Sequence, residues 1–105
     1  MAINEVDVEE LSERLAAGSR LVDVREPDEY ADGHVPGAVH VPLATVPDHV
    51  EQFRGDGPTY VICRSGARSL KACEFLADRG LDVVNVAGGT LAWQLSGREV
   101  EIARP

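Results

Sequence analysis

The chain has 105 residues, of which 44% are hydrophobic and 27% charged, so it is long enough for one compact domain and has an ordinary globular composition. Its 10 basic and 18 acidic side chains give a formal net charge of −8, which disfavours nucleic acids and anionic membranes as partners. Two cysteines are too few for a disulfide framework and indicate a reducing compartment. We therefore expect a single domain over residues 1–105, located in the cytoplasm.

Short extended and helical patterns alternate along the whole chain. In chain order, they predict a helix between Asp7 and Gly18, a strand at 21–24, a helix at 27–31, a strand at 38–41, a helix at 47–53, a strand at 59–63, a helix at 69–79, a strand at 82–86 and a helix between Gly89 and Gly97. Asp7 and Glu10 have the spacing of a capping box for the first helix. Strands separated by helices indicate a parallel sheet with helices on both faces.

Residues 63–69, Cys-Arg-Ser-Gly-Ala-Arg-Ser, form a short polar loop between a predicted strand and a predicted helix. Ligands of parallel sheets bind at the carboxyl ends of strands, which is where Cys63 lies. Gly66 permits a left-handed backbone, so successive N–H groups can converge on an anion at the helix N-terminus. Arg64 and Arg68 add local positive charge. A free cysteine has a pKa of about 8.5, so this environment favours the thiolate of Cys63 and predicts a nucleophile that needs no separate base.

Other candidate residues have structural interpretations. Cys73 lies in the middle of a predicted helix on its apolar face and is expected in the core, too far along the helix for a disulfide with the other cysteine. Asp23 and Arg25 flank a strand end, where we expect them to brace the structure around the loop rather than bind substrate. We expect Trp93 in the core and His34 bonded to backbone in a turn.

Taken together, the motifs resemble the rhodanese-like sulfurtransferases in their single-domain form. The resemblance extends over almost the whole chain and depends on motifs at residues 21–25, 28–30, 33–38, 40–42, 63–69, 88–89 and at Trp93. It implies a three-layer α/β sandwich whose central, mostly parallel sheet has five strands, with helices on both faces. It also implies that Cys63 is the catalytic residue and becomes a persulfide.

The resemblance assigns roles to the rest of the loop. The residues implied to bind substrate are Arg64, Ser65, Gly66, Ala67, Arg68 and Ser69. Asp23 and Arg25 keep the supporting role that their place at a strand end suggests. The backbone amides would hold the sulfur anion, the two loop arginines would attract an anionic donor, and Ser69 would also cap the helix. The donor is thiosulfate or a similar anion, and the acceptor is cyanide or a thiol, including a protein thiol. No metal or organic cofactor is required.

Two alternatives stay open at this point. The first is a persulfide relay or interaction module that acts on a protein partner, which the fold alone does not exclude. The second is a small cysteine phosphatase or arsenate reductase, whose similar loop has five residues between cysteine and arginine. Here four residues separate Cys63 from Arg68, and the loop contains no Asp or Glu to protonate a leaving alkoxide.

Overall fold

A computed structural model of the protein describes residues 2–103. Five strands form one sheet in the order β1-β5-β4-β2-β3, and each neighbouring pair is parallel. The strands are β1 (Glu5–Val6), β2 (Arg20–Asp23), β3 (Val39–His40), β4 (Thr59–Ile62) and β5 (Val83–Val86). The predicted α/β class with a five-stranded parallel sheet is therefore confirmed.

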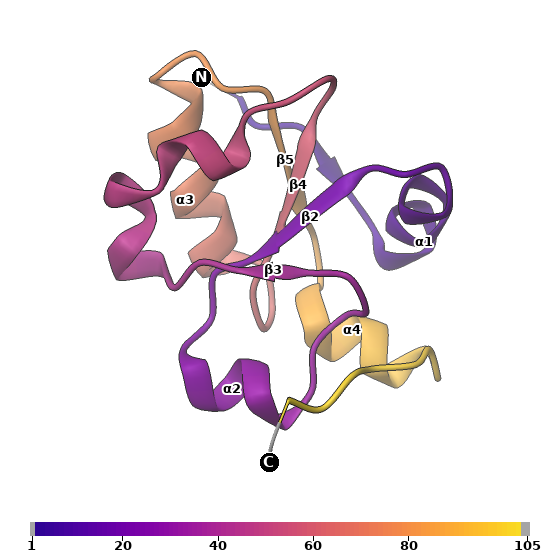
Figure 1. The fold of residues 1–105 in the computed structure, drawn as a ribbon. Coiled ribbons are helices and arrows are strands. Elements are labelled where there is room, and N and C mark those ends of the chain that lie inside the picture. The colour runs from indigo at the N-terminus through magenta and orange to yellow at the C-terminus, as the bar shows by residue number, and fades with distance from the viewer. Residues whose placement is uncertain (1, 104–105) are drawn as a thin grey trace.

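Helices cover both faces of this sheet (Figure 1). They are α1 (Val8–Ala16), α2 (Pro27–Asp32), α3 (Ala67–Ala77) and α4 (Gly89–Leu95), with two 3₁₀ segments, η1 (Leu43–Asp48) and η2 (Val50–Phe53). Helix α3 and the two 3₁₀ segments lie on one face, and α1 and α4 lie on the other. Within the described residues, none of these helices has the length and apolar character needed to cross a membrane.

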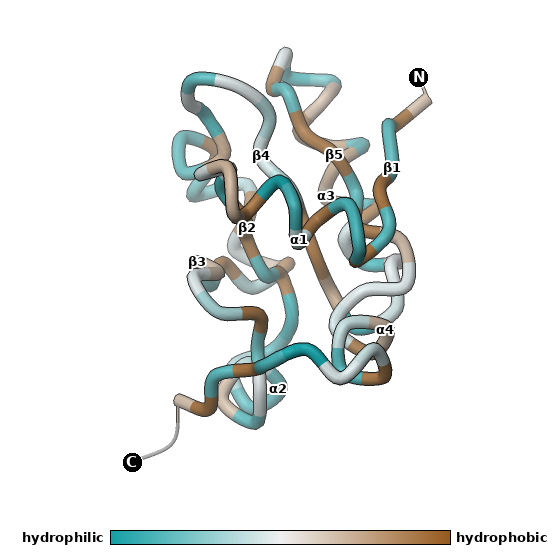
Figure 2. Tube along the Cα trace, turned by 90° about the vertical axis from the view of Figure 1, so that its right-hand side faces the viewer, coloured by the Kyte–Doolittle hydropathy of each residue, from teal (hydrophilic) through white to brown (hydrophobic). Residues whose placement is uncertain are grey.

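Buried apolar side chains form one cluster on each face of the sheet. Successive residues of a strand point to opposite faces, so Val61 of β4 belongs to the cluster under α3 and Ile62 to the cluster under α1 and α4. Phe53 belongs to the first cluster and Trp93 to the second, where the expected burial of the indole is confirmed. Along the chain trace, β5 is a largely hydrophobic stretch with one polar residue, Asn85 (Figure 2).

The structure differs from the prediction at two elements, one predicted wrongly and one missed. The helix expected over residues 47–53 is wrong: the region forms η1 and η2, with Pro47 inside η1. The backbone leaves the helical region at His49, with φ −131° and ψ 31°, so the region is divided into two short 3₁₀ segments and is not one α-helix. The strand β1 was not visible in the apolar pattern, because it consists of only two residues, one of them Glu5. It gains its place by pairing with β5.

The N-terminus of α1 lies where the sequence predicts it, whereas that of α3 does not. Asp7 is the N-cap of α1 and accepts a hydrogen bond from the backbone N–H of Glu10 at 2.9 Å, as predicted. The Glu10 carboxylate instead accepts from Arg14, so the capping box is only half formed. Helix α3 begins at Ala67, two residues earlier than predicted, with Gly66 as its N-cap. Ser69 therefore lies inside the first turn and is not the cap.

Candidate active site

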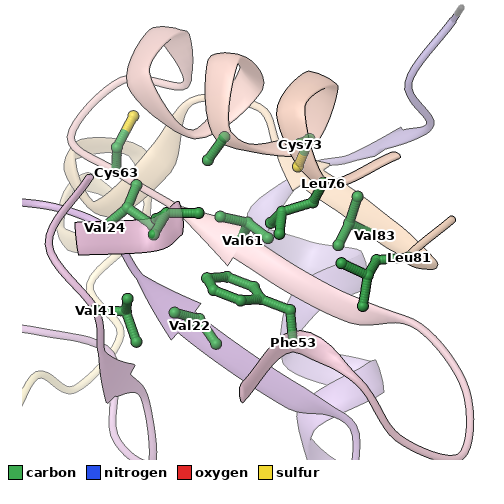
Figure 3. Packing of buried hydrophobic residues seen from close by; sticks show 12 residues of the cluster. Val22, Val24, Val41, Phe53, Val61, Cys63, Cys73, Leu76, Leu81 and Val83 are labelled. Atoms are coloured by element: carbon green, nitrogen blue, oxygen red, sulfur yellow. The ribbon is translucent and has the colours of Figure 1, made fainter. Parts of the chain in front are cut away.

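Cys63 follows β4 directly and lies at the carboxyl edge of the sheet. Its neighbours in register are the ends of β2 and β5, so the loop after Cys63 has rigid strands on both sides. The residue is only 1% exposed. Its sulfur nevertheless points away from the apolar side chains of the cluster, whereas the sulfur of Cys73 points into it (Figure 3).

Hydrogen-bond donors of the loop converge on the Cys63 sulfur. The backbone N–H of Gly66 donates to Sγ at 3.1 Å, and the hydroxyl of the fully buried Ser69 donates to it at 3.3 Å. Gly66 has φ +111°, a conformation that L side chains rarely adopt, and this turn directs its N–H to the sulfur. Burial raises the pKa of Cys63, but the Ser69 hydroxyl and the backbone N–H groups of Ser69, Gly66 and Ser65 more than offset it, so the pKa is lowered.

Cys73 provides an internal comparison for the same functional group. Both cysteines are free thiols, and Cys73 is fully buried under α3, where the sequence predicted it. The pKa of Cys73 is raised to about 12, and burial is the largest cause. The two thiols thus differ in the donors around them more than in their burial, and only Cys63 is prepared to carry negative charge.

Arg68 does not face outward as a free cation. Its guanidinium donates two hydrogen bonds to the carboxylate of Glu29 in α2, at 2.7 and 2.9 Å. This pairing lowers the pKa of Glu29 to about 2 and raises that of Arg68. The positive charge that the sequence suggested for attracting an anion is therefore largely neutralised, and the pair instead ties α2 to the start of α3.

Arg64 is the loop cation that remains available. Its side chain is exposed and makes no ion pair with any residue among 2–103. It lines a pocket of about 200 Å³ beside the loop, together with Arg25, Thr90, Leu91 and Gln94. Glu29 and Asp32 also border this pocket, so a bound molecule would meet groups of both charges.

Asp23 and Arg25 form a buried ion pair at the end of β2. The Asp23 carboxylate accepts from the Arg25 backbone N–H at 2.9 Å and from its guanidinium at 2.8 Å. The same guanidinium nitrogen donates to the carbonyl of Gly33 at 2.8 Å. The pair therefore fixes the segment around α2, which carries Glu29. His34, in that segment, bonds the backbone carbonyl of Tyr30 at 2.8 Å, as expected for a turn histidine.

Two further residues at the site were missed by sequence reasoning. Thr90, at the start of α4, donates to the carbonyl of Cys63 through both its backbone N–H and its hydroxyl. Asn85 of β5 donates to the carbonyl of Gly66 at 3.2 Å and to the carboxylate of Glu5 at 2.7 Å. A polar residue in an otherwise valine-rich strand was the available signal for Asn85. For Thr90, the only signal in the sequence was its position directly after two glycines.

A buried thiol that accepts hydrogen bonds from a backbone amide and a serine hydroxyl at a helix N-terminus, on the carboxyl edge of a parallel sheet, is the defining feature of this α/β protein. A profile described as Rhodanese-like domain matches residues 7–96. The chain is 40% identical over 96 residues to a putative sulfurtransferase, YtwF, of Bacillus subtilis (strain 168), covering 90% of this chain and 93% of that protein. It is 41% identical over 98 residues to a sulfurtransferase of Allochromatium vinosum, covering 90% and 92% respectively.

Solved structures agree with these sequence relationships. The crystal structure of a rhodanese-like domain protein from Staphylococcus aureus superposes with a TM-score of 0.85 at 37% identity, covering 95% of this chain and 98% of that one. The chain belongs to the rhodanese-like domain family, and it has relatives named sulfurtransferases.

Proposed function

We propose that this protein is a sulfurtransferase that carries sulfane sulfur as a persulfide on Cys63. The observation that carries the proposal is the group of donors around this thiol, from Gly66, Ser69 and Ser65, which lower its pKa despite burial. A thiolate is the nucleophile in sulfur chemistry, and a persulfide anion needs the same stabilisation one bond further out.

The first step balances without any cofactor. The Cys63 thiolate attacks the outer sulfur of thiosulfate, the new S–S bond forms, the S–S bond of thiosulfate breaks, and sulfite leaves with the bonding electron pair. A charge of −1 on the thiolate passes to the persulfide. In the second step, a thiolate or cyanide takes the outer sulfur and returns Cys63 to its thiolate.

Arg64 is the residue we propose for guiding the anionic donor and steadying sulfite as it leaves. It lines the pocket beside the loop and has no ion-pair partner within the described residues. Arg68 takes a positioning role, because Glu29 occupies its guanidinium. The backbone of residues 65–69 forms the cradle for the sulfur anion, whereas Asp23 with Arg25 acts at a distance by holding the segment around α2, which carries Glu29. A cytoplasmic location also belongs to this proposal, since both cysteines are free thiols.

Intact mass spectrometry after incubation with thiosulfate tests the proposal. We expect the wild type to gain one sulfur atom, which cyanide then removes as thiocyanate. The Cys63→Ser variant should gain none. Cys73→Ala is the matched control, because it removes the other thiol and should load like the wild type.

Three results discriminate the alternatives. Loading only from a persulfidated protein, and never from thiosulfate, would contradict the small-donor proposal and favour a relay. Release of phosphate from an aryl phosphate, with no sulfur loading, would favour a phosphatase. Loading that persists in Cys63→Ser would remove Cys63 from its proposed role.

A further inference from the structure

The first two carbonyl groups of the loop, those of Cys63 and Arg64, bond donors of α4. The carbonyl of Cys63 accepts from the backbone N–H of Thr90 at 2.8 Å and from its hydroxyl at 3.0 Å. The carbonyl of Arg64 accepts from the backbone N–H of Leu91 at 3.0 Å. We call these three donors, all from the first residues of α4, the α4 clamp.

The α4 clamp matters because a trans peptide is rigid. Its C=O and N–H bonds point in opposite directions, so holding a carbonyl on one side fixes the next N–H on the other. The peptide that joins Arg64 to Ser65 is held by its carbonyl against α4, and the N–H of Ser65 is among the groups that lower the pKa of Cys63. Leu91 thus fixes the Ser65 amide directly, whereas Thr90 holds the preceding peptide, whose N–H is that of Arg64, and acts on the cradle through the backbone of Arg64.

Gly89 allows α4 to come close enough for these bonds. A Cβ at this position would lie 2.4 Å from the carbonyl oxygen of Arg64 and 2.6 Å from that of Cys63. Both distances are far shorter than any real contact of a Cβ with an oxygen. The residue also has φ +59°, in the left-handed region. Glycine is therefore required here for the approach of two backbones, beyond its role in turning the chain.

We propose that Thr90 is a positioning residue for sulfur transfer: its hydroxyl holds the Cys63 carbonyl against α4 and so keeps the loop amides aimed at the sulfur. Thr90 is 1% exposed, and its hydroxyl has this carbonyl as its partner. The inference depends on the proposed function for its catalytic meaning. The effect of Thr90 on the pKa of the Cys63 thiol does not depend on that function.

Charged and titratable groups near Cys63 stay the same in the variants that test this. Arg68 of α3, already paired with Glu29 of α2, acts on Cys63 through space, as does Cys73, which the Cys73→Ala background removes from all variants alike. Arg64 is exposed beside it. Because none of these is altered by a change at Thr90, a shift in the titration of Cys63 would report the orientation of the amides.

The experiment measures the pH dependence of Cys63 alkylation by iodoacetamide in a Cys73→Ala background, which leaves one thiol. Thr90→Val removes the hydroxyl and keeps the shape, whereas Thr90→Ser keeps the hydroxyl. Thr45→Val is the matched control, because the Thr45 hydroxyl also donates to a backbone carbonyl, that of Pro42 at 2.8 Å, but in η1. Melting temperatures are recorded for each variant.

We expect T90V to raise the alkylation midpoint and to slow alkylation at pH below the midpoint by up to about threefold, less than the loss of a hydrogen bond made directly to the thiolate. T90S should stay close to the parent, and T45V should change only the melting temperature. An unchanged midpoint in T90V would overturn the proposal. Should T90V not fold, Thr90→Ala compared with T90S isolates the hydroxyl at equal loss of the methyl, and equal midpoints in that pair would overturn it.

A parallel measurement of sulfur loading separates this inference from the proposed function. A raised midpoint in T90V, in a protein that never loads sulfur from any donor, would support the clamp and contradict sulfur transfer. Normal loading by the parent with unchanged kcat and KM in T90V would support sulfur transfer and contradict a positioning role.

Discussion

Ser69 is the side chain that touches the Cys63 sulfur, and it has no contact with solvent. Its hydroxyl oxygen lies 3.3 Å from the sulfur and 3.2 Å from the carbonyl oxygen of Gly66, and its single hydrogen turns to the sulfur when Cys63 is a thiolate. The Cys63 thiolate is therefore stabilised by hydrogen-bond donors rather than by a neighbouring free charge. Arg68 lies close by, but Glu29 already holds it.

Ser69→Ala should therefore raise the pKa of Cys63. Loss of one hydrogen bond to the thiolate corresponds to up to about one pH unit, or up to about tenfold less thiolate at neutral pH. The midpoint of alkylation against pH measures the effect. Ser96→Ala is the control, because the Ser96 hydroxyl donates to the carbonyl of Trp93 at the end of α4. A midpoint in S69A equal to that in S96A would contradict the role of the hydroxyl.

Arg64→Gln tests the only loop cation that is not already paired among the described residues. Removing its charge should raise the thiosulfate concentration needed for half-maximal loading about fivefold, the value of roughly 1 kcal/mol for an exposed charge. Loading from an uncharged sulfane donor should change less. Lys71→Gln in α3 also takes the formal net charge from −8 to −9, so it controls for the general field of the protein. Equal effects of R64Q and K71Q would show that Arg64 has no local role.

At the scale of elements, the Glu29–Arg68 pair joins α2 to α3 across 39 positions of sequence. Its bond to Arg68 lowers the pKa of Glu29 from an ordinary 4.5 to about 2 in the folded state. The folded state therefore binds fewer protons at this group than the unfolded state between these values. The stabilisation is complete above pH about 4.5 and is lost as the pH falls toward 2.

Glu29→Gln should destabilise the protein by about 1 kcal/mol at neutral pH, a modest value because both side chains are partly exposed. The difference from wild type, measured by urea unfolding, should shrink as the pH falls below 4.5. Glu51→Gln is the control, because the pair of Glu51 with Arg54 is exposed and should contribute only a few tenths of a kcal/mol. A difference that persists unchanged at pH 3 would contradict the assignment.

At the scale of elements, the sequence predicts individual strands, helices and turns from neighbouring residues. The strand before Cys63 and the helix after it follow from an apolar run and from apolar spacing, and Gly66 marks the turn between them. Residues 47–53 show the limit of that approach, because their apolar spacing favours an α-helix, whereas the backbone breaks at His49 into two 3₁₀ segments.

Contacts that join distant segments could not be read from the sequence. Glu29 and Arg68 both appear as ordinary surface charges until α2 and α3 are placed side by side. Thr90 likewise gains its role only when α4 packs its first turn against the loop, which depends on Gly89. The loop motif predicts which atoms surround the sulfur, whereas the tertiary structure decides what holds those atoms in place.

At the scale of the whole molecule, one sheet separates the two apolar clusters, and the strands that support Cys63 contribute to both. We therefore expect the single domain proposed for residues 1–105 to unfold in one cooperative transition. Fluorescence of Trp93, in one cluster, and far-UV circular dichroism should have the same urea midpoint.

A change on the opposite face sharpens this test. Phe53→Leu alters the cluster that does not contain Trp93 and should destabilise the protein by about 1 kcal/mol. If the molecule is one cooperative unit, the fluorescence midpoint of Trp93 should shift as far as the circular dichroism midpoint. Separate midpoints, or a shift in only one signal, would show that the two faces unfold independently.

The most direct test of the central claim is the ultraviolet absorbance of the Cys63 thiolate as a function of pH, measured in the Cys73→Ala variant. Folded protein should titrate at a lower pH than the same chain unfolded in urea, because the loop donors stabilise the anion only when the fold brings them together. A folded midpoint equal to or above the unfolded one would show that burial outweighs the donors, and it would contradict the activation of Cys63.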